Sequence, residues 1–370
     1  PNDAILLLGA GTGLKRGIEK GFSSDVRNSM WIRATRTSIP YRGLAHGRSV
    51  QFTEADLAAI RRQIANVDII SAENPLGSAR QADIQVTYGN NFGSFGVFGV
   101  AKGYFDIKRY QEYRMGRRLN NLDDDERRKV VVIGTRVKDR LFGDKNPLGE
   151  QVIVNGVNFT VVGVFYDSGW EGRMSERLYM PLNTFQKTFG VGENISIIAV
   201  TPAEGFTGDD ITDELDALLK QRHNVAPEDR KAIYIFDLAK QSAQVNATIN
   251  AINFFIWFVG LGTLMAGIVG ISNIMIITVK ERTVEIGIRK ALGAPPWNII
   301  RTIILEAVIV TAFAGYAGLV LAVGLLELVN FTLTSMNVEL NYFTDPEVDF
   351  SVAMSALGIL VGCGVLAGFF

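Results

Sequence analysis

The chain has 370 residues, one cysteine, two histidines and a formal net charge of −1. The net charge by itself says nothing about nucleic acid, but the sequence contains no basic domain that would bind it. One cysteine excludes an intrachain disulfide. Two histidines, His46 and His223, leave too few ligands for a multi-histidine metal site, so each is expected to be a lone surface residue. The apolar residues are uneven: residues 14–250 are mixed and charged, whereas 251–370 contain long apolar runs.

We interpret residues 1–13 as the end of a membrane-spanning helix that the sequence cuts short, because residues 4–12 are apolar and Pro1 is first. A short core helix over 4–12 is the alternative. The glycines of Gly9–Gly13 have neither the Walker A spacing nor a preceding soluble strand, so they do not indicate a phosphate-binding loop.

The next region, residues 29–102, combines strands with one helix. The sequence Thr53-Glu-Ala-Asp56 indicates a capping box with Asp in the acidic position, followed by apolar residues at helical spacing. Gly89–Gly99 contains four glycines, so we expect much of it to be loop. Four segments are strand candidates: residues 30–39, 67–71, 83–88 and, more weakly, 95–100.

Residues 103–190 have a different, mostly β pattern. A buried strand is predicted at 130–133 and a helix at 135–142, and Asn155-Gly156 is a favoured two-residue hairpin turn within 151–165. From Asn194 the first pattern returns, as a strand at 195–200, a helix containing Ile211 and Leu215, and a strand at 232–236. We therefore predict one split α+β half formed by 29–102 and 191–237, with a β-rich subdomain inserted at 103–190.

From Leu238 a helical pattern without Gly or Pro continues into the first long apolar run, so we predict one helix over 238–279 with a stalk at 238–250. Three apolar runs exceed or reach the roughly 20 residues that cross a bilayer. They predict spans at 251–279 and 302–328, and a last span at 350–370 that the sequence cuts short.

The connecting segments set the expected orientation. Segment 280–301 has five basic and two acidic residues, whereas 329–349 has no Lys or Arg and four acids. The positive-inside rule places 280–301 in the cytoplasm, and 329–349 and 14–250 outside. The predicted fold class is an α+β membrane protein with four transmembrane helices and a large external two-lobed α+β domain.

Two features lie within the predicted spans. Stripes of small residues permit close helix packing, within one chain or between two; they are Gly262, Ala266, Gly270, Ala314, Gly318 and Ala322. Glu306 is the one charge between 302 and 326. We expect it to pair with Arg301 or with another basic residue of 280–301 rather than to mark an ion pathway.

The charged segment itself is amphipathic. The apolar residues Val284, Ile288, Ala291 and Leu292 share one side, and Glu285 and Arg289 form an i,i+4 pair. Gly293 and the following prolines end the helix. We predict a short helix on the membrane surface that docks a partner; a simple linker is the alternative. No nucleophile–base set is found, so we expect no catalytic residues and no metal site.

Two stretches resemble a known family. Residues 281–294, ERTVEIGIRKALGA, closely resemble the coupling segment of the MacB/FtsX/LolC-LolE permeases of mechanotransmission-type ABC transporters. Five further stretches resemble the MacB periplasmic core domain: Gly103–Asp106, Gly116-Arg117, Val130–Gly134, Leu141–Gly149 and Val154–Val164.

The resemblance implies a multi-pass protein of the bacterial inner membrane that acts as a homodimer or a related heterodimer. It also implies that the split half of the external domain, 29–102 and 191–237, is porter-like. It implies an ABC ATPase, fused or separate, that binds ATP and Mg²⁺ in place of this chain, and it allows a periplasmic adaptor and an outer-membrane channel. No nucleic acid is expected. The residues implied in ATPase coupling are Glu281, Arg282, Val284, Glu285, Ile286, Ile288, Arg289, Lys290 and Gly293.

The function that we expect is export of a drug, peptide or lipid-like substrate, driven by ATP hydrolysis in the cytoplasm. Two alternatives use the same motion: an FtsX-like transmitter that activates a periplasmic enzyme, and a lipoprotein-release permease. A third alternative, which does not use this motion, is a membrane-anchored adhesin or sensor without an ATPase.

Overall fold

The structure is a computed structural model that describes residues 28–77, 83–109, 111–167 and 172–335, together with 358 and 362. The chain divides into two compact units. The head unit comprises Glu19–Gln244, and the helical unit comprises Pro1–Ile18 and Val245–Phe370. The predicted span at 1–13, nearly all of the span at 350–370 and most of the loop at 329–349 lie outside the described residues.

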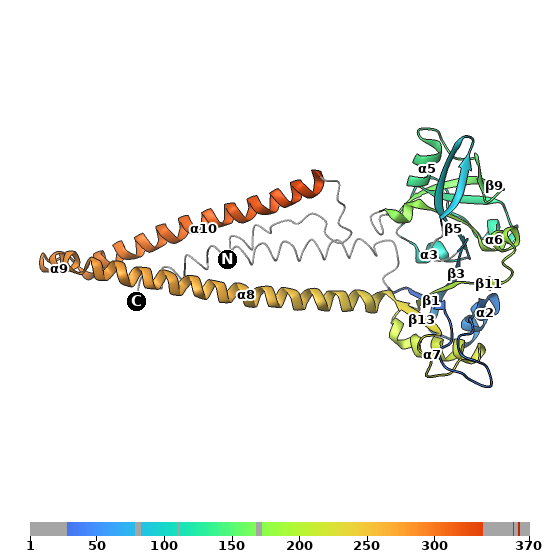
Figure 1. The fold of residues 1–370 in the computed structure, drawn as a ribbon, viewed down its shortest axis with the longest axis horizontal. Coiled ribbons are helices and arrows are strands. Elements are labelled where there is room, and N and C mark those ends of the chain that lie inside the picture. Colours follow the sequence, from blue (N-terminus) through green and yellow to red (C-terminus); the bar gives the residue numbers. More distant parts are fainter. Residues whose placement is uncertain are drawn as a thin grey trace. The chain divides into compact units, whose positions relative to one another are not determined.

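The first lobe of the head unit is an antiparallel sheet covered by two helices (Figure 1). Its strands are β3 (Val67–Pro75), β12 (Ile197–Pro202), β1 (Met30–Ala34) and β13 (Ile233–Asp237), in that order. The helices are α2 (Glu54–Gln63) and α7 (Gly208–Arg222), and a small ladder joins β2 (Phe52–Thr53) to β11 (Asn194–Ile195).

The core of the first lobe follows from the alternation of side chains along each strand. Met30 and Ile32 on β1 contribute to the same buried cluster as Ile60 of α2 and Ile211 and Leu215 of α7. Both helices therefore pack their apolar sides on one face of the sheet, as the helical spacing in the sequence predicts.

The second lobe is a closed ring of strands. Among the described residues, six strands pair in the order β4 (Asp83–Tyr88), β5 (Asn91–Val100), β10 (Arg177–Pro181), β7 (Val130–Gly134), β9 (Val157–Tyr166) and β8 (Gln151–Val154), which returns to β4. The pairing of β10 with β5 closes the ring. Outside the ring, β6 (Glu112–Gly116) pairs with β9.

Short helices connect and cover these strands. They are α3 (Tyr104–Ile107), α4 (Asn121–Asp125), α5 (Thr135–Phe142), α6 (Leu182–Phe189) and the 3-10 helix Arg173–Glu176. The predicted hairpin is confirmed as β8–β9, and both turn residues have positive φ, 47° at Asn155 and 82° at Gly156, as a two-residue turn of this kind requires.

The glycine-rich stretch predicted to be mostly loop is instead the ten-residue strand β5, so that prediction is wrong. Aromatic rings occupy the space that a side chain at these glycine positions of β5 would need. A Cβ added at Gly99 would be 2.4 Å from Cγ of Phe185, and one at Gly96 would be 2.9 Å from Cε2 of Phe98. The glycines are therefore required by close packing rather than by flexibility.

The lobe boundary predicted at residue 103 is also wrong. Strands β4 and β5 belong to the ring of the second lobe, and Val86, Phe95 and Val97 pack in its core. The end of β5 pairs with β3 through Phe98–Val100, so the two lobes share one continuous sheet. The two lobes are distinct only in their packing, because the buried cluster of the first lobe is separate from that of the second. A third cluster, which includes Tyr104 and Tyr179, is distinct from both.

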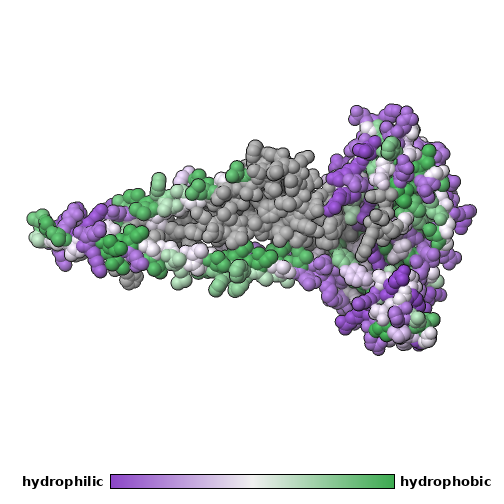
Figure 2. Space-filling view, in the orientation of Figure 1, coloured by the Kyte–Doolittle hydropathy of each residue, from purple (hydrophilic) through white to green (hydrophobic). Residues whose placement is uncertain are grey.

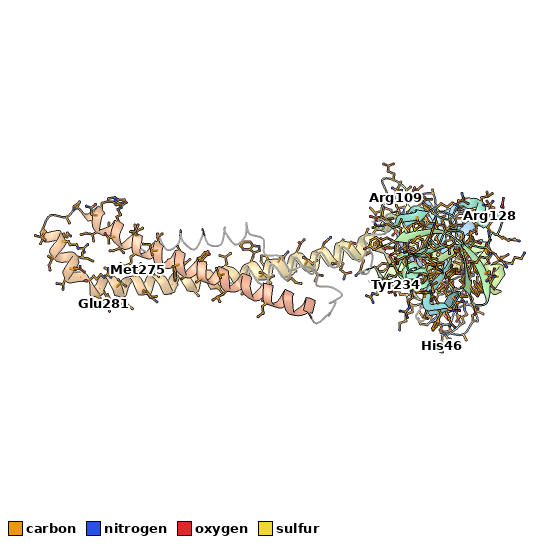
Figure 3. The ribbon with its side chains drawn as sticks, turned by 90° about the horizontal axis from the view of Figure 1, so that it is seen from above. His46, Arg109, Arg128, Tyr234, Met275 and Glu281 are labelled. Atoms are coloured by element: carbon orange, nitrogen blue, oxygen red, sulfur yellow. The ribbon has the colours of Figure 1, made fainter. Side chains whose placement is uncertain are left out.

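The helical unit is described through three helices: α8 (Leu238–Glu281), which starts in the head unit, α9 (Thr283–Ala291) and α10 (Pro296–Ser335). The long helix predicted from 238 is present. The helix that contains the predicted span 302–328 continues to Ser335, beyond the predicted end, because no Gly–Pro stop follows residue 328. Figure 3 labels Met275 and Glu281 on the part of α8 that leads to α9.

Within the described residues, two helical stretches are long and apolar enough to cross a membrane, Leu238–Glu281 and Trp297–Gly318. Their surfaces are largely hydrophobic in Figure 2. Bulky apolar side chains on them are exposed, including Phe254, Trp257 and Phe258 of α8 and Phe313 of α10. Such a surface is the expected outer face of a helix that lies in lipid.

Candidate functional site

Helix α9 is joined to its neighbours by very short connections. Arg282 alone separates it from α8, and backbone hydrogen bonds cross this residue, from Arg282 N to Thr278 O and from Ile286 N to Arg282 O. At the other end Gly293 has φ +86°, and the N–H of Ala294 donates to Arg289 O. This glycine turn and the following Pro296, the first residue of α10, separate the two helices as the sequence predicts.

One side of α9 is an apolar stripe that no described residue covers. We call it the α9 stripe, and it consists of Val284, Ile288 and Leu292, whose exposures are 76%, 57% and 82%. The four-residue spacing places these side chains on one side of the helix. Trp297, at the start of α10, is also exposed, at 62%. Exposed apolar side chains grouped in this way indicate an interaction surface.

The polar residues of α9 are exposed too. Arg289 Nη2 lies 3.3 Å from Glu285 Oε1, which confirms the predicted i,i+4 pair. A pair this open to solvent contributes little stability, so both charges can interact with a partner. Of the predicted coupling residues, Ile286 is half-buried, whereas Glu281, Lys290 and Gly293 are exposed.

Glu306 forms an ion pair with Arg282. Nη1 of Arg282 lies 3.0 Å from Oε2 of Glu306, and Nη2 lies 3.3 Å from Oε1. The predicted pairing with a basic residue of segment 280–301 is confirmed, and the alternative partner Arg301 is not the one used. Two parallel contacts of this kind make the guanidinium–carboxylate pair geometrically specific.

The small-residue stripe of α8 faces open space in the described part of this chain. A Cβ added at Gly262 or Gly270 would meet no described atom within 4 Å, and Ala266 is exposed. On α10, Ala314 is exposed and Gly318 is half-buried; the side chain of Ala322 lies outside the described set. No described residue of this chain therefore packs closely against Gly262 or Gly270.

The head unit contains a charged cluster that the sequence analysis missed. His223 was expected to be a lone surface residue, and that expectation is wrong: its Nε2 lies 3.0 Å from Oδ2 of Asp56. Arg222 Nε donates to the other oxygen, Oδ1, at 2.5 Å. Burial raises the pKa of Asp56, but the hydrogen bonds with His223 and Arg222 outweigh it and hold the pKa well below its usual range.

This cluster joins the capping box of α2 to the end of α7, so its role is structural. The one signal in the sequence was the capping box, in which Thr53 N donates to Asp56 Oδ2 at 2.8 Å. His46, by contrast, is exposed on the loop after β1 (Figure 3). In the described ranges, no group of three or more His, Cys, Asp or Glu side chains is arranged to hold a metal ion.

The fold and the site define a membrane permease with a large external α+β domain. Residues 4–218 match the MacB-like periplasmic core domain, and residues 257–370 match the FtsX-like permease C-terminal domain. The chain belongs to the MacB/FtsX family of ABC-transporter permeases.

Curated relatives are named "Macrolide export ATP-binding/permease protein MacB". The protein from Bdellovibrio bacteriovorus is 30% identical over 88% of this chain and 50% of its own length. That from Neisseria meningitidis serogroup A is 29% identical over 99% of this chain and 53% of its own. The chain spans about half the length of the curated relatives it matches.

Two solved structures are similar to this chain. The periplasmic region of MacB from Actinobacillus actinomycetemcomitans is 24% identical and covers 62% of this chain and 95% of that one, with a TM-score of 0.48. The extracellular domain of the transporter YknZ from Gram-positive bacteria is 20% identical over 57% of this chain and all of that one, with a TM-score of 0.45.

Proposed function

We propose that this chain is the permease of an ATP-driven exporter, in which α9 receives the movement of an ABC ATPase. The observation that carries the proposal is the α9 stripe, Val284, Ile288 and Leu292, which no described residue covers. It is flanked by the exposed charges of Glu285 and Arg289. An apolar centre with charged neighbours is the composition of a protein-docking surface.

Helix α8 is suited to carry that movement to the external domain. It begins directly after β13, and its first residue, Leu238, is buried and donates its N–H to Ser29 O at 3.1 Å. Lys240 Nζ lies 3.0 Å from Asp209 Oδ1 of α7, which adds a second contact with the first lobe. Because α8 is one uninterrupted helix to Glu281, a displacement at α9 is transmitted along it without an intervening loop.

The ATPase is proposed to be a separate subunit or a fused domain that binds ATP and Mg²⁺. The relatives' printed name, ATP-binding/permease, and their greater length support this. We further propose four spans, with segment 280–301 in the cytoplasm and the external domain in the periplasm of a bacterial inner membrane. The charge difference between segments 280–301 and 329–349 supports this orientation.

The active form is proposed to be a dimer that moves a drug, peptide or lipid-like substrate from the periplasmic side. The uncovered Gly262 and Gly270 support a contact between copies, since small residues allow close approach of helices in lipid. A periplasmic adaptor and an outer-membrane channel would complete the route across the envelope.

The test is docking of the ATPase to variants of α9 in the reconstituted full-length permease. Ile288→Asp and Arg289→Glu are expected to weaken ATPase binding and permease-stimulated ATP hydrolysis by roughly tenfold or more, since each places a wrong charge in the interface. Phe92→Asp is the matched control, because Phe92 is exposed to a similar extent, 62% against 57%, but lies on β5 of the external domain. Wild-type binding and stimulation by both α9 variants would show that α9 is only a linker.

A further inference from the structure

The bend between α8 and α9 is built from one residue and reinforced locally. Arg282 has φ −93° and ψ 10°, so the chain turns there without leaving helical hydrogen bonding altogether. The hydroxyl of Thr283 donates to Val279 O at 3.0 Å and to Lys280 O at 2.8 Å. These bonds satisfy carbonyl groups that the end of a helix leaves without backbone donors. The start of α9 is thus a defined joint.

The side chain at this joint reaches a different helix. Arg282 makes its two contacts, at 3.0 and 3.3 Å, with Glu306, which lies on α10 and is separated from it by 24 residues. The ion pair closes a loop that contains all of α9, the Gly293 turn and the beginning of α10. Helix α9 is consequently held at both ends, by the glycine turn on one side and by the ion pair on the other.

The surroundings make this pair difficult to replace. Glu306 is the single charged residue between positions 302 and 326, within a stretch apolar enough to cross a membrane. The side chains of Arg282 and Glu306 are 52% and 40% exposed, so protein packing does not bury the pair. Its importance comes from the position of Glu306 in a stretch that is expected to lie in lipid, where a charge requires a partner. The i,i+4 pair of Glu285 and Arg289 differs, because both of its members lie on α9 and it connects α9 to nothing else.

We propose that Arg282 and Glu306 are positioning residues that lock α9 to α10, so that a push on α9 displaces α8 and α10 together instead of tilting α9 alone. The effect of this lock on ATPase coupling rests on the proposed function, whereas the lock itself does not depend on that function. Neither residue needs to touch the ATPase. The pair converts a nine-residue helix, which is too short to be stable alone, into a fixed lever.

The experiment is amide hydrogen exchange of the full chain in lipid nanodiscs, followed over α9. Arg282→Gln and Glu306→Gln are expected to accelerate exchange of the α9 amides by about tenfold, because opening of this segment no longer requires breaking the pair. The charge swap, Arg282→Glu with Glu306→Arg, should restore most of the protection. Arg301→Gln is the matched control, since it removes a neighbouring cation of α10 that is not the partner of Glu306, and it should exchange as wild type.

Slow exchange of the external domain reports that each variant is folded. If Glu306→Gln fails to fold, Glu306→Asp and Arg282→Lys retain the charges but lose the paired geometry, and they should give intermediate α9 exchange. Wild-type α9 exchange in both single variants, or a swap no better protected than the single variants, would overturn the lock.

The same variants separate this inference from the proposed function. Loss of α9 protection in Arg282→Gln together with unchanged ATPase stimulation would support the lock and reject its contribution to coupling, whereas wild-type stimulation in Ile288→Asp and Arg289→Glu would reject the coupling role of α9 itself. Loss of stimulation in Ile288→Asp together with wild-type α9 exchange in Arg282→Gln would support coupling and reject the lock.

Discussion

The phenolic hydroxyl of Tyr104 donates a 2.9 Å hydrogen bond to Oε2 of Glu73, and both side chains are buried. Glu73 lies on β3 at its first pairing with β5, and Tyr104 begins α3, which follows β5. Arg177 of β10 lies over the ring of Phe98 at 4.6 Å, with Nη1 3.9 Å from the other oxygen of Glu73. These polar contacts hold the two lobes together where their shared sheet passes from one to the other.

Tyr104→Phe should therefore loosen the connection between the lobes. The substitution leaves the buried carboxylate of Glu73 without its best donor, a loss that typically costs about 1–3 kcal/mol. The thermal unfolding midpoint of the external domain should fall, and amides of β3 and β5 should exchange faster. Tyr234→Phe serves as the control, because Tyr234 is 55% exposed on β13 (Figure 3). Equal midpoints for the two variants would mean that the hydrogen bond contributes nothing to the junction.

Two capping boxes of the first lobe offer a matched comparison. Asp56 and Asp210 occupy the same position in the boxes of α2 and α7, but Asp56 is buried against Arg222 and His223 whereas Asp210 is exposed. Asp56→Asn should cost about 1–3 kcal/mol of stability, because it removes a charged acceptor from a buried site. Asp210→Asn should cost clearly less, because its carboxylate is exposed to solvent. Urea unfolding measures the free energy of unfolding of the two variants. Similar losses of stability in both would contradict a structural role for the cluster of Asp56, Arg222 and His223.

Asp229 should make the stability of the external domain depend on acid pH. Burial raises its pKa, but hydrogen bonds from the Ser38 hydroxyl and from the backbone N–H groups of Ser38, Lys231 and Ile39 outweigh that effect and lower the pKa to about 2. Because the folded-state pKa lies below the ordinary value of about 3.9, the ionised carboxylate stabilises the fold above that value. The stabilisation is lost as pH falls from about 4 to about 2.

The measurement is the unfolding midpoint at pH 7 and at pH 3. Wild type should lose more stability over this interval than Asp229→Asn, which has no carboxylate to protonate and should already be less stable at pH 7. Asp68→Asn changes an exposed carboxylate on β3 and is the control. An identical pH dependence in wild type and Asp229→Asn would exclude Asp229 as the source.

Gly262→Leu and Gly270→Leu should weaken association of two copies in the membrane, since a large side chain prevents close approach of the helices. Leu261→Phe is the control: it enlarges an exposed side chain of α8 that the helical period places on the side away from the stripe. A Cβ added at Gly262 or Gly270 has no described atom within 4 Å. Cross-linking in native membranes would report the proposed dimer. Retention of the dimer by both stripe variants would place the contact elsewhere.

Local patterns were sufficient for the elements whose cause lies within a few residues. The apolar runs of α8 and α10, the Asn155-Gly156 hairpin and the capping box at Thr53 were all predictable. The amphipathic spacing of α9 and the end of this helix before Gly293 were predictable in the same way. In each case the determinant is a short-range preference: helical periodicity, a turn that needs positive φ, or a side chain that caps the nearest N–H groups.

Contacts between distant residues were decided only by the tertiary structure. The glycine at position 99 of β5 is required by the ring of Phe185, a residue far along the chain that fills the space beside it. Closure of the ring by β5 and β10, the pairing of Asp56 with a histidine 167 residues away, and the choice of Arg282 over Arg301 by Glu306 all join segments far apart in the chain. Such contacts depend on which surfaces the packed elements bring together, and the spacing of residues along the sequence does not contain that information.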